Sequence, residues 1–340
     1  AAAELHRIIE RVQPQDPNLA AMTSAVLKLL DEQSVNVNMM SKRDLVVVIV
    51  DENGDLVGDF RDRKAEGIDD PLTIKAIVLD SGGVRLAYAL FDLIVNHVSA
   101  ESAPFLDWLA NGDDSAAADM FLTPERVFGH EPRADELAAI HRPRPTPPFT
   151  EFTFADGTHR LVWTTFTDRQ VDIDVEHELG WNHLLGILDR FRAGGVTIVR
   201  LDAVGYAIKR AGTSCFMLPE TFDFIDRLTA ACHERGMRVL VEVHGHYRDQ
   251  VALATRVDLV YDFALPPLVL DALYRGDASA LKQWIAIRPT NAVTVLDTHD
   301  GIGVIDVGAD SDGSPGLLAP SQIDNLVDTI HKNSHGQSKQ

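Results

Sequence analysis

Cysteine is scarce in this sequence, with only Cys215 and Cys232 among 340 residues. Two cysteines cannot build a disulfide framework, which excludes a small disulfide-rich secreted protein. Cys232 lies in a helical pattern, where we expect a small buried hydrophobic residue, whereas Cys215 lies in a loop, where it can be exposed. The thirteen histidines form no H-E-x-x-H motif and no C-x-x-C occurs, so we expect no metal at a catalytic site.

Basic residues are also few, with 31 Lys and Arg against 51 Asp and Glu, a formal net charge of −20. This excess of acid argues against nucleic acid or an anionic membrane as a partner, because both require a basic surface. No apolar run is long enough to span a bilayer, and the first residues lack the features of a signal peptide. We therefore expect a soluble cytoplasmic protein, long enough for a barrel with an insertion or for two ordinary domains.

The stretch at 196–206, V-T-I-V-R-L-D-A-V-G-Y, is typical of a strand buried on both faces that ends in polar residues. Side chains two apart on a strand share a face, so the guanidinium of Arg200 and the carboxylate of Asp202 are predicted to be neighbours. The positive charge then keeps Asp202 ionised. A carboxylate held in this way is able to act as a nucleophile.

Three other short apolar segments end in polar residues in the same way: F-D-L-I-V-N-H at 91–97, R-V-L-V-E-V-H at 238–244 and N-A-V-T-V-L-D-T-H-D at 291–300. The spacing of these segments leaves room for β/α units, and a TIM barrel builds its active site from polar groups at the ends of its strands. A single carboxylate after a strand is more often the N-cap of the next helix. Four polar strand ends together favour a site made of His97, Asp202, Glu242 and Asp300.

The segments D-L-I-V-N-H, R-L-D-A-V-G-Y, L-V-E-V-H and L-D-T-H-D resemble the four signature regions of the α-amylase superfamily, glycoside hydrolase family 13. Flanking stretches are similar to the sucrose phosphorylases of that family: K-R-A-G-T-S-C-F-M at 209–217, Y-D-F-A-L-P-P-L at 261–268 and D-T-H-D-G-I-G-V-I-D-V-G at 297–308. The resemblance runs from about residue 91 to 335. It implies an α/β fold, a (β/α)8 TIM-type barrel with a small inserted domain after the third strand.

The first ninety residues do not match the resembled family. Helical spacing covers 20–32, and 44–60 has the pattern of a hairpin around an Asn-Gly turn. A second strand pair, 72–79 with 84–95, is predicted around Ser81-Gly82-Gly83. Antiparallel hairpins differ from the first strands of a parallel barrel. This segment is either a foreign or altered N-terminus or a divergent way of closing the barrel.

The resemblance divides the remaining chain into parts. We expect the catalytic barrel at 91–97 and 179–310, the inserted domain at 98–178, and a C-terminal helix with a mobile tail at 311–340. The sequence ends before the eighth strand, an acceptor loop and the β-domain of the resembled family, so the barrel is expected to be incomplete or altered. Such a chain is an active enzyme, a glucoside-binding or regulatory protein without turnover, or a partial chain completed by a second copy, as in a possible homodimer, or by another polypeptide.

The inserted segment contains further candidates. The proline-rich run at 141–149 cannot be a helix interior or a central strand, so we expect an extended loop. Arg142 and Arg144 on this loop are candidates for contacting the sugar or the phosphate, although solvated loop arginines are equally common. Phe166 and Gln170 resemble residues beside the donor site, although an aromatic residue there is more often packing.

The resemblance implies a retaining double displacement that transfers glucose from sucrose to inorganic phosphate and releases fructose. Asp202 is then the nucleophile and Glu242 the acid and later the base, with a raised pKa. Asp300 is expected to bind the sugar hydroxyls in the transition state. No organic cofactor or metal is required, and a related phosphorylase that uses another glucoside, such as glucosylglycerate, stays open.

Further binding residues complete the expected site. Arg200 holds Asp202 charged, and His97 and His299 are expected to contact sugar hydroxyls. The histidines at 244 and 246 lack a third ligand at a suitable spacing, so we expect them to form hydrogen bonds around the acid rather than bind a metal.

Overall fold

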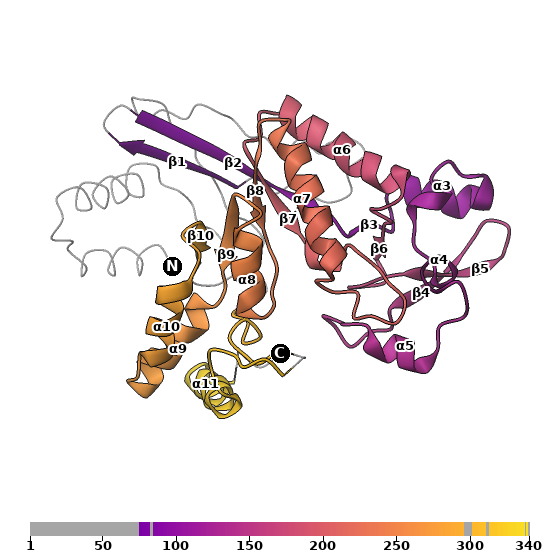
Figure 1. The fold of residues 1–340 in the computed structure, drawn as a ribbon. Coiled ribbons are helices and arrows are strands. Elements are labelled where there is room, and N and C mark those ends of the chain that lie inside the picture. Colours follow the sequence, from indigo (N-terminus) through magenta and orange to yellow (C-terminus); the bar gives the residue numbers. More distant parts are fainter. Residues whose placement is uncertain (1–74, 82–83, 296–300, 311–312, 337, 339–340) are drawn as a thin grey trace. The chain divides into compact units, whose positions relative to one another are not determined.

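The computed structural model describes residues 75–81, 84–295, 301–310, 313–336 and 338 (Figure 1). The expected helix at 20–32 and the expected hairpin at 44–60 lie outside the described residues, as do His299 and Asp300.

A six-stranded sheet organises the described part of the chain. Its order is β1 (Lys75–Ser81), β2 (Val84–Ile94), β7 (Ile198–Asp202), β8 (Arg238–Val241), β9 (Leu259–Asp262) and β10 (Ala292–Thr294). The hairpin predicted across 81–83 is present, because β1 pairs antiparallel with β2. From β2 to β10 every neighbouring pair is parallel. The fold is therefore α/β with a largely parallel sheet, and the four predicted polar segments follow or contain four of its strands.

Helices connect the parallel strands, as β/α units require. They are α6 (Glu178–Ala193), α7 (Pro219–His233), α8 (Tyr247–Ala254), α9 (Leu265–Arg275) and α10 (Ser279–Ile287), and α11 (Pro320–Asn333) follows the sheet. Helix α6 buries Leu184, Leu188 and Phe191, which recur at helical spacing on one face, and Gly194 is its C-cap. Helix α7 begins with a proline at its first turn, where the missing N–H costs no hydrogen bond.

Between β3 (His97–Ser99) and α6 the chain forms short elements. These are α3 (Ala103–Asn111), η1 (Gly112–Asp114), η2 (Ala118–Met120), α4 (Pro124–Phe128), α5 (Ala134–Ala139), β4 (Phe149–Thr153), β5 (His159–Trp163) and β6 (Gln170–Asp172). Strand β3 pairs with β6 and β4 with β5, both antiparallel. Residues 141–148 form neither helix nor strand, as the prolines predict.

One continuous hydrophobic cluster joins these short elements to the parallel sheet. Phe105, Trp108 and Phe121 belong to the same buried cluster as Leu201 and Val239 of the central strands. Because interiors are close-packed, a shared core fixes the short elements against the strand ends. The positions of β3 and β6 are therefore tied to those of β7 and β8.

The two cysteines are both buried. Cys232 lies on α7 with no exposed surface, as expected. The suggestion that Cys215 is exposed is wrong, since it is only 2% exposed and packs in a second cluster with Trp163 and Phe128. Its loop folds back onto the short elements, and the sequence pattern of a single loop cannot reveal that contact.

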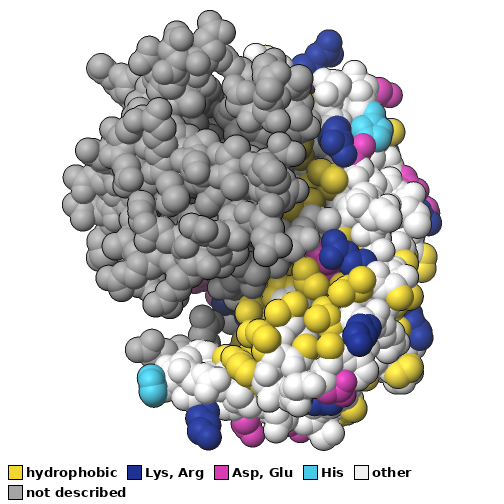
Figure 2. Space-filling view, turned by 90° about the vertical axis from the view of Figure 1, so that its left-hand side faces the viewer, with side chains coloured by type: hydrophobic (Ala, Val, Ile, Leu, Met, Phe, Trp, Pro, Cys, Tyr) yellow, Lys and Arg dark blue, Asp and Glu magenta, His cyan; other side chains and the backbone are white. Residues whose placement is uncertain are grey.

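Some large hydrophobic side chains stay exposed, including Leu273 at 72% and Ile285 at 55% on α9 and α10. Figure 2 shows a face of the described surface on which hydrophobic side chains gather beside acidic and basic ones. Among the described residues, none of the helices has both the length and the apolar character needed to cross a bilayer.

Replacing Leu201, which is fully buried on β7, tests the central position of this strand in the core. We expect Leu201→Ala to lower the free energy of unfolding by about 2–5 kcal/mol, because it removes buried methyl groups and leaves a cavity. Leu273→Ala is the matched control, and its effect should stay within about 0.5 kcal/mol. Urea unfolding followed by circular dichroism measures both, and equal losses would contradict the assignment of Leu201 to the core.

Candidate active site

A buried arginine lies at the centre of the candidate site. The side chain of Arg200 is 4% exposed, and its guanidinium contacts three carboxyl groups. Nη1 lies 3.2 Å from Oδ1 of Asp92 and 3.1 Å from Oδ1 of Asp202, and Nη2 contacts Oε2 of Glu242. The predicted contact between Arg200 and Asp202 is confirmed.

The strand register explains this convergence. Asp92 on β2 pairs directly with Arg200 on β7, and Asp202 follows on the same face. At the next strand end, the backbone N–H of Glu242 donates to the carbonyl oxygen of Leu201 at 3.2 Å. Three adjacent parallel strands therefore deliver three carboxyl groups to one cation.

The charge of Arg200 is maintained by these partners. Burial alone would lower the pKa of the guanidinium, but Glu242, Asp92 and Asp202 raise it above its ordinary value. The guanidinium also lies over the ring of Tyr261, 5.9 Å from the centroid, where a cation is attracted by the aromatic face. Burial raises the pKa of this tyrosine, which keeps its hydroxyl neutral.

Glu242 and Asp202 are distinguished by their environments. The side chain of Glu242 is 6% exposed, whereas that of Asp202 is 26% exposed. Burial, followed by a hydrogen bond with Asp202, raises the pKa of Glu242 to about 9, although Arg200 acts in the opposite direction. A carboxyl group that keeps its proton near neutral pH next to a more accessible carboxyl group is the arrangement that general acid catalysis needs.

A second group of predicted residues meets beside β3. Nε2 of Gln170 donates to Nε2 of His97 at 2.8 Å, and the ring of Phe166 lies 5.2 Å from the imidazole centroid. The antiparallel pairing of β3 with β6 brings these residues together across more than seventy positions of sequence. Phe166 also packs edge-on against Tyr206, from the loop that follows β7.

A buried charged network fixes this second group. Nζ of Lys209 donates to Oδ1 of Asn96 at 2.7 Å and forms an ion pair with Asp172 at 2.8 Å. Asp172, at the end of β6, also accepts a hydrogen bond from the backbone N–H of Thr165 at 2.9 Å. The network ties the loop after β7 to β6, which carries Gln170. No local pattern indicated this network, because its members are polar residues far apart in the sequence.

The two arginines of the proline-rich loop differ. Arg142 donates to Oγ1 of Thr146 and to the carbonyl oxygen of Pro147, both at 2.8 Å, so it holds the loop together. Arg144 is exposed and has no hydrogen bond or ion pair among the described residues. Of the pair, Arg144 has the side chain that is available to a ligand.

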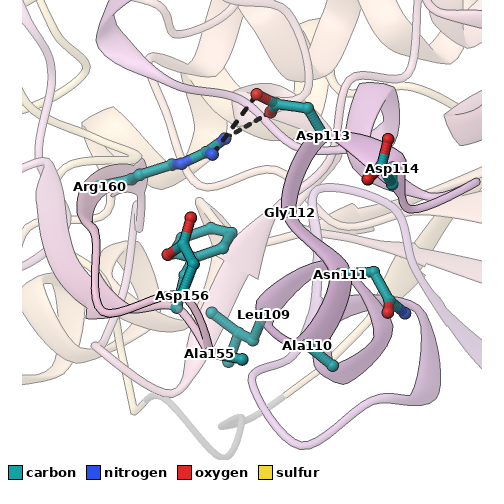
Figure 3. A pocket seen from close by; sticks show the side chains of 10 residues that line it. Leu109, Ala110, Asn111, Gly112, Asp113, Asp114, Ala155, Asp156 and Arg160 are labelled. Atoms are coloured by element: carbon teal, nitrogen blue, oxygen red, sulfur yellow. Dashed lines mark hydrogen bonds and ion pairs between the residues drawn. The ribbon is translucent and has the colours of Figure 1, made fainter.

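A cavity of about 320 Å³ lies elsewhere, between α3, η1 and the turn that joins β4 to β5 (Figure 3). Arg160 enters it and forms an ion pair with Asp113, Nη1 to Oδ1 at 2.5 Å. None of the predicted site residues lines this cavity. Within the described ranges, no group of three or more His, Cys, Asp or Glu side chains is arranged to hold a metal ion.

Sequence reasoning did not single out Asp92 or Tyr261. Asp92 is a charged residue inside the apolar segment at 91–97, and its place directly opposite Arg200 could have been inferred from pairing the two strands. Tyr261 stands in a stretch used for the family resemblance but carried no expected role. His299 and Asp300 lie outside the described residues, so their placement relative to Arg200 stays a prediction.

The raised pKa of Glu242 predicts a dependence of stability on pH. The unfolded chain loses this proton near the ordinary value of 4.5, so the stabilising contribution is complete below that pH and declines as pH rises toward the folded value. Glu242→Gln is neutral in both states. The melting temperature of the variant minus that of the wild type should therefore increase from pH 5 to pH 8, as measured by calorimetry. The exposed Glu125→Gln is the control, and a flat difference for Glu242→Gln would contradict the raised pKa.

No protein-family model matches the chain. Among curated relatives, it is 56% identical over 248 residues to a sucrose phosphorylase from Agrobacterium vitis, covering 73% of this chain and 51% of the relative. It is 53% identical over 252 residues to a sucrose phosphorylase from Bifidobacterium adolescentis, covering 74% and 50%. A glucosylglycerol phosphorylase from Marinobacter adhaerens is 41% identical over 244 residues, covering 72% and 49%. The chain spans about half the length of the curated relatives it matches.

A solved structure is similar as well. The sucrose 6F-phosphate phosphorylase from Thermoanaerobacter thermosaccharolyticum superimposes with a TM-score of 0.66 at 38% identity, covering 72% of this chain and 50% of that chain. Sequence similarity and fold similarity thus agree with the motifs that surround Arg200. Over about three quarters of its length the chain is therefore homologous to sucrose phosphorylases, and over a similar share it superimposes on a related phosphorylase of solved structure.

Proposed function

We propose that the protein transfers the α-glucosyl group of sucrose to inorganic phosphate, giving α-D-glucose 1-phosphate and fructose with retention of configuration. The observation that supports this proposal is the contact of Asp202 and Glu242 with the same buried Arg200, together with the raised pKa of Glu242. Two neighbouring carboxyl groups in different protonation states are what a double displacement requires. The kinship with sucrose phosphorylases supports the choice of donor.

In the first step the carboxylate of Asp202 attacks the anomeric carbon. The bond from that carbon to the fructosyl oxygen breaks, and Glu242 gives its proton to the departing oxygen. The two carboxyl groups are hydrogen-bonded to each other, whereas about 5 Å separates such groups around a glycosidic bond in retaining enzymes. The glycosidic oxygen would therefore replace this hydrogen bond.

In the second step a phosphate oxygen attacks the anomeric carbon of the glucosyl ester. The bond to Asp202 breaks and regenerates its carboxylate, while Glu242, now ionised, takes the proton that phosphate releases. Arg200 stabilises the negative charge that alternates between its two partners. No cofactor or metal takes part in this scheme.

The remaining predicted residues are proposed to bind the donor. His97, Gln170 and Phe166 form one contacting group that would hold the glucosyl ring, supported by their mutual contacts. Asp300 and His299 are proposed to bind hydroxyl groups of the same sugar. Arg144, exposed on the proline-rich loop, is proposed to contact phosphate.

The proposal extends to the architecture. We propose that 91–97 and 179–310 contribute to a (β/α)8 barrel, with 98–178 as its inserted domain, 1–90 as an atypical N-terminal segment and 311–340 as a C-terminal helix and tail. The parallel order of β2, β7, β8, β9 and β10 supports this division.

The second candidate function is phosphorolysis of another glucoside, which the 41% identity to a glucosylglycerol phosphorylase favours. Only the leaving group differs, so Asp202 and Glu242 keep their proposed roles. Assays with sucrose and glucosylglycerol side by side, at equal phosphate concentration, distinguish the two by their rates of glucose 1-phosphate formation.

Asp202→Asn tests the nucleophile. We expect glucose 1-phosphate formation from sucrose and phosphate to fall by a factor on the order of 10⁴ or more, because no covalent ester can form. Asp226→Asn, which removes an exposed carboxylate on α7, should leave the rate unchanged. Turnover that survives in Asp202→Asn would remove the proposed mechanism. Sucrose that raises the melting temperature without product formation would indicate a binding protein instead.

Arg144→Ala tests the proposed phosphate contact. We expect the KM for phosphate to rise about tenfold, since a charge-assisted hydrogen bond is lost, with little change in melting temperature. Arg142→Ala should instead lower the melting temperature, because it removes two hydrogen bonds within the loop. The proposal fails if the phosphate KM of Arg144→Ala equals that of the wild type in the same assay.

A further inference from the structure

Asp306, in the loop between β10 and α11, is a fully buried carboxyl group that the proposed mechanism does not use. Its Oδ1 accepts hydrogen bonds from the backbone N–H of Gly245 at 3.2 Å and from Nε2 of Gln250 at 3.0 Å. Its Oδ2 lies 3.0 Å from Nδ1 of His244. The loop therefore reaches back more than fifty residues to fix the segment that follows Glu242.

The partners of Asp306 determine where the proton of His244 lies. Burial raises the pKa of Asp306, and hydrogen bonds from His244, Gly245 and Gln250 oppose that shift. Both the backbone N–H of Gly245 and Nε2 of Gln250 donate to Oδ1, and these hydrogen bonds favour the ionised carboxylate, whose Oδ2 can only accept. Nδ1 of a neutral His244 must then carry the proton, and Nε2 carries a lone pair.

Nε2 of His244 is buried and has no hydrogen-bond partner among the described residues. A buried polar atom without a partner is costly, so a group that donates a hydrogen bond to this atom would be stabilised. The side chain as a whole is 27% exposed, so part of the ring lies at the surface, next to the buried Nε2.

A stack of rings connects His244 to the candidate active site. Its imidazole lies 3.9 Å from the ring centroid of Phe263 with an interplanar angle of 16°. Phe263 in turn stacks on Tyr261 at 4.9 Å and 15°, and Tyr261 lies beneath the guanidinium of Arg200. His244 also follows Glu242 by two residues. The ring is therefore held beside the reacting carboxyl groups.

Gly303 provides the space that the pair of Asp306 and His244 needs. A Cβ atom at this position would lie 2.5 Å from Oδ2 of Asp306 and 3.3 Å from Nδ1 of His244. The backbone of Gly303 is not in the left-handed region, so the requirement for glycine arises from this close approach and not from strain.

We propose that Asp306 is a positioning residue that locks His244 in one ring orientation and one tautomer, so that Nε2 accepts a hydrogen bond from a hydroxyl group of the substrate's leaving group. The inference deepens the proposed function and rests on it for the identity of the substrate. The lock itself depends only on contacts within the chain. Glu242 donates its proton to the glycosidic oxygen, whereas Nε2 of His244 would only accept a hydrogen bond from a neighbouring hydroxyl group, which keeps its proton.

The imidazole nitrogen signals of the full chain test the lock directly. In two-bond ¹H–¹⁵N spectra, the wild type should show His244 with protonated Nδ1 and unprotonated Nε2, assigned by the signals that vanish in His244→Gln. In Asp306→Asn the amide oxygen stays with Gly245 and Gln250, so its NH₂ group faces His244. The tautomer should therefore reverse, with the proton moving to Nε2.

Two further variants make the test specific. Asp271→Asn also removes a buried carboxyl group, on α9, and should leave the His244 signals unchanged. Gly303→Ala should displace Oδ2 and give a mixture of tautomers. A wild-type ring that is already protonated at Nε2, or a pattern that Asp306→Asn does not change, would overturn the proposal.

Kinetics separate this inference from the proposed function. If the chain turns over sucrose, Asp306→Asn should raise the KM for sucrose about tenfold with a smaller change in kcat, since an uncharged hydrogen bond to the leaving group is lost. An unchanged KM would overturn the role toward the substrate. Absence of turnover in the wild type would contradict only the proposed function. The nitrogen spectra would still test whether Asp306 fixes the tautomer of His244.

Discussion

A buried cation surrounded by three carboxyl groups is the constraint on which the candidate site depends. Arg200 cannot leave water without partners of opposite charge, and removing any partner of a buried ion pair leaves an uncompensated charge. Asp92, Asp202 and Glu242 meet it only if β2, β7 and β8 keep their register. The same contacts that stabilise the sheet therefore fix the relative positions of the two carboxyl groups that the proposed reaction uses.

The sequence predicted what depends on local patterning. The strand within 196–206 follows from its apolar residues, and the contact between Arg200 and Asp202 follows from side chains sharing a face. Burial of Cys215, the ion pair of Asp92 and the hydrogen bonds of Asp306 were not predicted. Each of these depends on a partner far away in the sequence, which no local pattern specifies. The expected roles of Asp300 and His299 fall on residues outside the described part.

Two buried aspartates outside the reacting pair, Asp172 and Asp306, each hold in place a segment that carries a proposed binding residue. Asp172 anchors β6, which carries Gln170 toward His97, through Lys209 and Thr165. Asp306 anchors the segment that carries His244. Each aspartate is close to a side chain that is proposed to contact substrate. The aspartates do not react themselves, but their hydrogen bonds orient these binding side chains. Such supporting contacts limit how far a binding side chain can stray from its productive position.

The acidity of the molecule has a consequence for the proposed acceptor. Phosphate is a dianion near neutral pH, and at long range it approaches a chain of net charge −20 against electrostatic repulsion. Added salt shortens the Debye length to about 8 Å at physiological ionic strength and so weakens this repulsion. Encounter between phosphate and the glucosyl-enzyme should accordingly become faster with moderate ionic strength, the reverse of the behaviour of enzymes that attract anions from a distance.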